Sequence, residues 1–493
     1  MPTKALWQTK SIEQSIADTN EPGTRLRKNL GALDLTVFGV AVIIGAGIFV
    51  LAAQQAGDTA GPAVSLSFVL AAIACGFAVL CYAELASTVP VAGSAYTYSY
   101  ATFGEFIAWI IGWDLILEFS VGGAVLAKSW SAYLGDTTGG ALATTVDVAG
   151  ITIDWGALLL VGVLTVILAL GIKLSSRVSQ VITAIKVAVV LLVIAVGIAF
   201  INASNYRPFV PPARPGGSSG GTEQSLLSLL FGAESSTYGI FGVLAAASVV
   251  FFAFIGFDIV ATTAEEARNP QRDMPRAIIG SLAIVTVLYV AVALVITGMQ
   301  PYTALTTSPS GDTATLATAF TNVGLPWIAG IIGLGALAGL TTVAMILMLG
   351  QIRVLYAMSR DGLFPRALAR TGSRGTPVRA TVGVGAVVGV VAALFPILRL
   401  EEMVNIGALF AFVLVSAGVL VLRRTRPDLP RGFRTPLVPL VPLLAILSCL
   451  WLMLNLSVGT WIRFLVWLAI GLVVYFAYGA RKSRLRLEAP AGV

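Results

Sequence analysis

The sequence contains no histidine, three cysteines and few charged residues. The absence of histidine excludes a histidine proton relay, a histidine metal site and a histidine-dependent catalytic triad. Cys75, Cys81 and Cys449 all lie inside apolar runs, so they suggest neither a disulfide framework nor a metal site. Charged residues make up 11% of the 493 residues, against about 25% in soluble globular proteins. This shortage of charge excludes an ordinary soluble chain.

Long apolar runs take up most of the chain, which is 57% hydrophobic and has a mean hydropathy of +0.90. A helix needs about 20 mostly apolar residues to cross a bilayer. Twelve runs meet this requirement: 32–56, 63–89, 101–126, 154–174, 179–201, 237–266, 275–298, 325–355, 379–397, 401–423, 436–457 and 459–480. The sequence therefore predicts an all-α polytopic membrane protein whose main partner is the lipid bilayer.

The connectors between these runs alternate between rich and poor in Lys and Arg. With a cytoplasmic N-terminus, the positive-inside rule is satisfied. The cytoplasmic connectors and tail then hold Lys173, Arg177, Arg268, Arg272, Arg276, Arg360, Arg366, Arg370, Arg374, Arg423, Arg424, Arg426, Arg431, Arg434, Arg481, Lys482, Arg484 and Arg486. The opposite connectors hold Arg207, Arg214 and Arg399. We therefore predict the cell membrane as the location and both termini in the cytoplasm. This placement explains the net charge of +7 better than a nucleic-acid partner does.

The stretch at 43–49, Ile-Ile-Gly-Ala-Gly-Ile-Phe, interrupts the first apolar run. Each of Gly45 and Gly47 costs a helix about 1 kcal/mol relative to alanine. A break inside the membrane is tolerated where the freed N–H and C=O groups face protein, water or a ligand. Two interpretations stay open for this stretch alone: the backbone faces a ligand, or the glycines form a smooth face for close helix packing.

A second interrupted run favours the ligand interpretation. The sixth run contains Phe-Phe-Ala-Phe-Ile-Gly-Phe-Asp at 251–258, with Gly256 again in mid-run. Because the sixth run comes five runs after the first, and five is odd, the second half has the opposite orientation. Transporters built from inverted repeats carry interrupted helices at such matching positions.

Lys186 lies about 8–10 residues inside the fifth run, roughly 12–15 Å from its cytoplasmic end. A lysine in a dry bundle can load and release a proton near neutral pH, or supply the positive charge that a sodium ion would otherwise bring. The alternative is an amine whose stem reaches back to the interface.

Three acidic residues also lie at membrane depth. Asp114 and Glu118 are four residues apart and share a helix face. They could pair with Lys186, hold a cationic substrate side chain or bond neighbouring polar groups. Asp258 follows the second break, where it could hold the backbone open or contact a substrate ammonium. Glu118 and Asp258 are our candidates for substrate contact.

Five motifs resemble the amino acid–polyamine–organocation (APC) superfamily. GAGIF at 45–49, FAFIGFD at 252–258 and EEARNP at 265–270 resemble the superfamily. YAMSRDG at 356–362 and EMVNIGALFAF at 402–412 resemble its bacterial cationic amino acid transporter branch. The likeness extends from about residue 25 to 480.

This resemblance implies a LeuT-like bundle of twelve helices with five-plus-five inverted repeats, in which helices 1 and 6 are broken. The domains it implies are a cytoplasmic segment at 1–30, a transport core at 31–424 with repeats 31–201 and 237–424, two further helices at 436–480 and a cytoplasmic tail at 481–493.

The resemblance also implies a binding site. The substrate carboxylate would meet backbone N–H groups at the start of a half-helix, where free donors and a positive dipole end favour an anion. The ammonium would meet carbonyls at the end of the other half-helix. The residues so implied are Ala46, Gly47 and Ile48 for the carboxylate, Ile43, Phe252 and Ile255 for the ammonium, Phe252 also as a gating aromatic, and Lys186 as the proton-coupling lysine. Many relatives carry Ser or Thr where this chain has Ala46, so one hydroxyl contact is missing.

The function expected from these features is secondary active transport of an amino acid together with a proton, by alternating access. Exchange of amino acids or amines is the alternative. A channel would need a selectivity filter, an ATP-driven pump a P-loop and an enzyme a catalytic or metal-ligand cluster, and the sequence shows none of these. We therefore expect no cofactor beyond the proton, no nucleic-acid partner, and a monomer or small homo-oligomer. Whether the substrate is cationic or neutral stays open.

Overall fold

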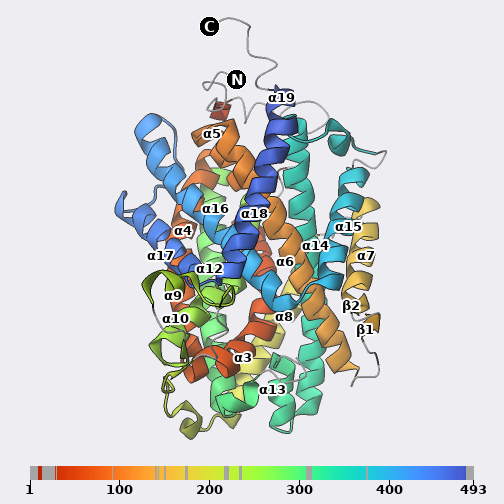
Figure 1. Ribbon diagram of the computed structural model, residues 1–493, viewed down its shortest axis with the longest axis vertical. Coiled ribbons are helices and arrows are strands. Elements are labelled where there is room, and N and C mark those ends of the chain that lie inside the picture. Colours follow the sequence, from red (N-terminus) through yellow and green to blue (C-terminus); the bar gives the residue numbers. More distant parts are fainter. Residues whose placement is uncertain are drawn as a thin grey trace, which may run out of the picture.

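The computed structural model describes residues 9–13, 28, 30–91, 93–138, 142, 144–148, 151–171, 176–215, 221–232, 236–306, 314–372 and 376–484. Helices dominate these ranges (Figure 1). Most of the predicted segments 1–30 and 481–493 lie outside the described residues.

The long helices confirm a polytopic all-α membrane protein. Eight described helical segments are long and apolar enough to cross a bilayer, and four shorter apolar helices accompany them. The main helices are α2 (Ala32–Ile43), α4 (Val64–Thr88), α6 (Glu105–Thr137), α7 (Trp155–Ala169), α8 (Ser176–Gly197), α10 (Gly239–Val250), α12 (Pro270–Met299), α14 (Pro326–Arg360), α15 (Val378–Leu394), α16 (Ile397–Thr425), α17 (Leu440–Leu454) and α18 (Val458–Val474).

Shorter elements lie in the connectors or continue the interrupted helices. The short α-helices are α3 (Ala52–Gln55), α5 (Ala95–Thr102), α9 (Leu226–Phe231), α11 (Phe257–Ala261), α13 (Leu316–Asn322) and α19 (Ala480–Lys482). Strand β1 (Thr145–Val148) pairs antiparallel with β2 (Ile151–Asp154), and β3 (Arg214–Pro215) with β4 (Ser236–Thr237). The connector at 202–236, which is rich in Pro, Gly and Ser, contains helix α9 and strand β3.

Helix α6 differs from the third predicted span, 101–126, at both ends. It begins at Glu105, because Gly104 with φ 95° separates it from α5. It continues to Thr137, beyond the apolar run, because polar side chains there find partners inside the protein. Ser131 Oγ donates to Asp154 Oδ1 at 2.6 Å, for example.

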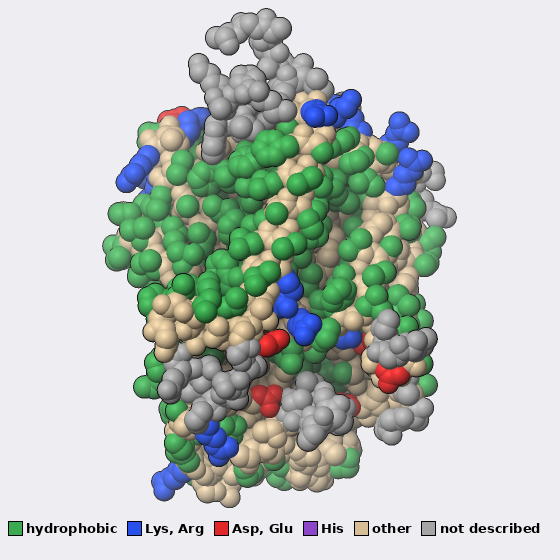
Figure 2. Space-filling model, in the orientation of Figure 1, with side chains coloured by type: hydrophobic (Ala, Val, Ile, Leu, Met, Phe, Trp, Pro, Cys, Tyr) green, Lys and Arg blue, Asp and Glu red, His purple; other side chains and the backbone are tan. Residues whose placement is uncertain are grey.

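In the view of Figure 2, Lys and Arg side chains line the upper end of the molecule above a broad apolar belt, and others lie in its lower half. The first and last described segments meet at this arginine-rich end. Lys10 Nζ lies 3.3 Å from Asp361 Oδ1, and the backbone N–H of Arg484 donates to the carbonyl of Asp361 at 3.0 Å. Both ends of the described chain are therefore on the same side.

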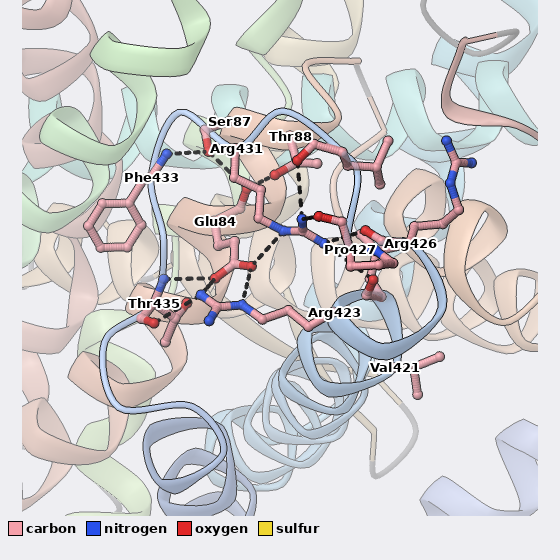
Figure 3. A network of polar contacts seen from close by, with 12 residues as sticks. Glu84, Ser87, Thr88, Val421, Arg423, Arg426, Pro427, Arg431, Phe433 and Thr435 are labelled. Atoms are coloured by element: carbon pink, nitrogen blue, oxygen red, sulfur yellow. Dashed lines mark hydrogen bonds and ion pairs between the residues drawn. The ribbon is translucent and has the colours of Figure 1, made fainter.

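A buried carboxylate ties α4 to α16 at the arginine-rich end (Figure 3). Glu84 is 1% exposed and accepts from Arg423 Nε at 2.9 Å and Nη2 at 2.7 Å, and from the backbone N–H of Thr435 at 2.7 Å. Arg431 Nε lies 3.2 Å from Glu84 Oε1. A buried charge is tolerated where its oxygens are paired in this way. The network fixes the connector after α16 onto the end of α4.

Candidate functional site

The first break separates α2 from the π-helical turn η2 (Gly47–Leu51). Helix α2 ends at Ile43, and Ile44 is extended with ψ 95°. The new helix begins around Ala46, and its Phe49 N–H donates back to Gly45 at 3.5 Å. The amides of the first turn of a helix lack acceptors within that helix. Those of Ala46, Gly47 and Ile48 are in this position.

Carbonyl groups at the end of α2 accept hydrogen bonds from two side chains on other helices. Lys186 Nζ, on α8, donates to Ala41 O at 2.7 Å and to Ile44 O at 3.2 Å. The hydroxyl of Tyr289, on α12, donates to Ile43 O at 2.7 Å. Lys186 is fully buried, so its amine does not reach the interface. The snorkelling alternative is therefore wrong in this structure.

The second break separates α10 from α11. The chain passes through the 3-10 turn η7 (Phe251–Phe254), an extended Ile255 and Gly256 with φ 129°. This φ is rarely adopted by residues with a side chain, and a Cβ at 256 would lie 2.7 Å from Val42 Cγ1. Asp258 Oδ1 accepts from the Gly256 N–H at 3.2 Å, so this carboxyl holds the turn open from within.

The two breaks touch each other. A Cβ built on Gly47 would lie 2.2 Å from the Cβ of Ala253 in η7, closer than real side chains approach. Gly47 therefore serves close packing. The same stretch also borders a cavity, so the ligand interpretation stays a prediction beside the packing role of Gly47.

A small cavity lies between the breaks. Its walls come from five elements and are almost entirely apolar. They are Val42, Ile43, Gly45, Ala46 and Gly47 of the first break, Glu118, Gly122 and Leu126 of α6, Phe252 and Ile255 of the second break, Val343 and Leu347 of α14, and Val404 of α16. Glu118 is the one ionisable side chain in this lining. Within the described part of the chain neither of its carboxyl oxygens has a hydrogen-bond partner.

Six of the predicted binding residues border this cavity: Ile43, Ala46, Gly47, Phe252, Ile255 and Glu118. Ile48 is fully buried in η2 but does not line it. Asp258 bonds its own turn, and Lys186 lies behind the first break on the carbonyls of α2. The roles of these residues in binding stay predictions.

The acidic residues at membrane depth form a buried group. Asp114, Glu118 and Asp258 are each at most 1% exposed, and both Asp114 oxygens lack partners among the described residues. A Cβ on Gly407 of α16 would lie 3.0 Å from Asp114 Oδ1, so α16 closes over the group. Among the described residues no ion pair joins these acids to Lys186, and no cluster of His, Cys, Asp or Glu could hold a metal ion.

Sequence reasoning missed Tyr289 and the aliphatic walls from α6, α14 and α16. A single tyrosine in an aliphatic span was the available signal, because a buried Tyr hydroxyl usually needs a partner. The aliphatic walls gave no such signal, since Leu126, Val343, Leu347 and Val404 resemble lipid-facing residues in sequence.

Residues 30–477 match the family model described as amino acid permease. This chain belongs to the amino acid permease family, within the APC superfamily. The permease is 43% identical over 492 residues to a branched-chain amino acid permease, BcaP, of Bacillus subtilis, covering 98% of this chain and 99% of that one. It is 39% identical to a methylthioribose transporter of the same organism, covering 98% and 99%. It is 35% identical to cationic amino acid transporter 4 of Arabidopsis thaliana, covering 86% and 68%. The family consists of transporters, so the prediction that the protein is no enzyme is confirmed.

Proposed function

We propose that this permease moves amino acids with uncharged, apolar side chains across the cell membrane, together with a proton and by alternating access. The observation that carries the substrate class is the lining of the cavity, in which aliphatic walls face a single ionisable group, Glu118. A guanidinium or ammonium side chain placed against such walls would lose its hydration without gaining enough partners. BcaP of Bacillus subtilis, the relative named for branched-chain amino acids, agrees with this class.

The two ends of the amino acid would bind to backbone groups. The amides of Ala46, Gly47 and Ile48 at the start of η2 would hold the carboxylate, since a helix start favours an anion. The carbonyls of Phe252 and Ile255 would hold the ammonium, with Glu118 as a nearby negative group. The Ile43 carbonyl accepts a hydrogen bond from the Tyr289 hydroxyl. To bind the substrate ammonium, it would have to accept from the ammonium in addition to that hydroxyl or in place of it.

The proton would be carried through Lys186. Its ammonium bridges two carbonyls at the end of α2, so loss of the proton removes a cation that holds the first break together. That connects proton release to the geometry of the binding site. Fully buried Glu118 could take part as a second protonatable group.

The wider arrangement is part of the same proposal. The eight long and four shorter apolar helices support twelve spans, and the two interrupted helices support a LeuT-like pair of inverted repeats. The arginine-rich end would face the cytoplasm, with both termini there. We propose a monomer or small homo-oligomer.

Purified protein in liposomes tests the proposal. Labelled leucine should accumulate unchanged inside liposomes that start empty, and an inward proton gradient should increase the rate. Uptake that requires amino acid preloaded inside would show exchange instead. Failure to move any amino acid under either condition would overturn the proposal.

A further inference from the structure

Helix α16 contacts both sides of the second break. Asn405 Nδ2 donates to Ser248 O at 3.0 Å and to Val249 O at 3.2 Å, which are carbonyls in the last turn of α10. Seven residues further along, on the same face of α16, the ring of Phe412 lies 5.7 Å from Phe251 and 4.7 Å from Phe257. The helix thus spans the break as a brace.

The asparagine holds the point at which α10 changes into the 3-10 turn. Carbonyls in the last turn of an α-helix lose their regular partners, and tightening to 3-10 winding shifts the remaining bonds. Asn405 supplies amide donors at this position and is itself fully buried. Its neighbour Val404 lines the cavity, so the brace and the cavity wall are one turn of the same helix.

We propose that Asn405 is a positioning residue of the substrate site. By fixing the end of α10 it sets where Phe252 and its carbonyl lie in the cavity, although it does not line the cavity itself. The proposal rests on the proposed function for its transport readout, but its structural part does not.

Three substitutions test it. Asn405→Ala removes both donors, Asn405→Ser keeps one hydroxyl donor, and Asn405→Asp keeps the shape without the amide donors. Ser359→Ala, which removes a buried hydroxyl from α14 more than ten residues beyond cavity-lining Leu347, is the matched control. If the aspartate variant fails to fold, the two neutral variants carry the test.

The first measurement is leucine uptake per folded protein in liposomes. Loss of two hydrogen bonds should raise the KM of Asn405→Ala about tenfold. Vmax should stay near that of the parent, with Asn405→Ser in between and Ser359→Ala unchanged. A KM within about twofold of the parent, or a fall of Vmax alone, would overturn the proposal.

The second measurement is amide hydrogen exchange across 248–257, which does not depend on transport. Amide exchange there should increase in Asn405→Ala and not in Ser359→Ala, because the turn loses the two hydrogen bonds from Asn405. Unchanged exchange would overturn the positioning role even if uptake changes. If the parent moves no amino acid but amide exchange across 248–257 still increases in Asn405→Ala, the proposed function is refuted and the positioning role of Asn405 is retained.

Discussion

Replacement of Gly47 by alanine tests how closely the two broken helices must approach. The new Cβ would lie 2.2 Å from the Cβ and 2.4 Å from the Cα of Ala253, and the second of these atoms is backbone. Overpacking of this kind costs about 1–3 kcal/mol. Alanine in place of a helical glycine gains about 1 kcal/mol, so the clash should outweigh the gain. We expect Gly47→Ala to lower the stability and to displace the two breaks from each other.

Two other glycines supply the controls. A Cβ at Gly76, in α4, meets nothing within 4 Å, so Gly76→Ala should match or exceed the parent in stability. A Cβ at Gly45 would meet Leu126 at 3.4 Å and Val343 at 3.7 Å, which is ordinary contact but projects toward two cavity walls. Gly45→Ala should therefore fold and bind bulky substrates less well.

Thermal unfolding of the three variants, followed by leucine uptake in liposomes, is the assay. Gly47→Ala should melt below the parent and lose most of its uptake, whereas Gly76→Ala should retain both. If Gly47→Ala melts as high as Gly76→Ala and transports as the parent does, the close approach of the breaks is not required and the reasoning fails.

Three further outcomes follow from the contacts. Lys186→Met should abolish the response of leucine uptake to an imposed pH gradient; an unchanged response would show that the coupling proton is held elsewhere. Tyr289→Phe removes the hydroxyl that donates to the Ile43 carbonyl, so thermal unfolding should show a loss of stability of about 1 kcal/mol and leucine uptake should show a changed KM. An unaltered KM would argue that the substrate does not compete with this hydroxyl for the carbonyl. Glu84→Gln leaves Arg423 without its carboxylate and should destabilise the protein by about 3 kcal/mol in denaturation; a loss below about 1 kcal/mol would mean that solvent replaces the pair.

The membrane-spanning character and the two breaks could be predicted because they depend on local composition. A helix that must cross a bilayer needs an apolar run, and an interruption inside it needs glycine or another weak helix former. Gly45, Gly47 and Gly256 carried this signal, and the structure places breaks at each of these stretches.

The partners of the breaks could not be predicted in the same way, because they come from distant parts of the chain. Lys186 was noticed for its depth, but its contact with the α2 carbonyls depends on how α8 packs. Asn405 appeared within a motif, yet its bond to α10 spans 157 residues. The boundary of α6 was also misjudged, since its last turns are stabilised by tertiary partners such as Asp154 rather than by apolar composition.

A competition panel measures whether the cavity between the two breaks takes amino acids with apolar side chains. Each unlabelled amino acid is offered in equal excess against labelled leucine in liposomes containing the parent protein. Isoleucine and valine should displace leucine, and arginine and lysine should not. Displacement by arginine as strong as that by isoleucine would contradict this expectation.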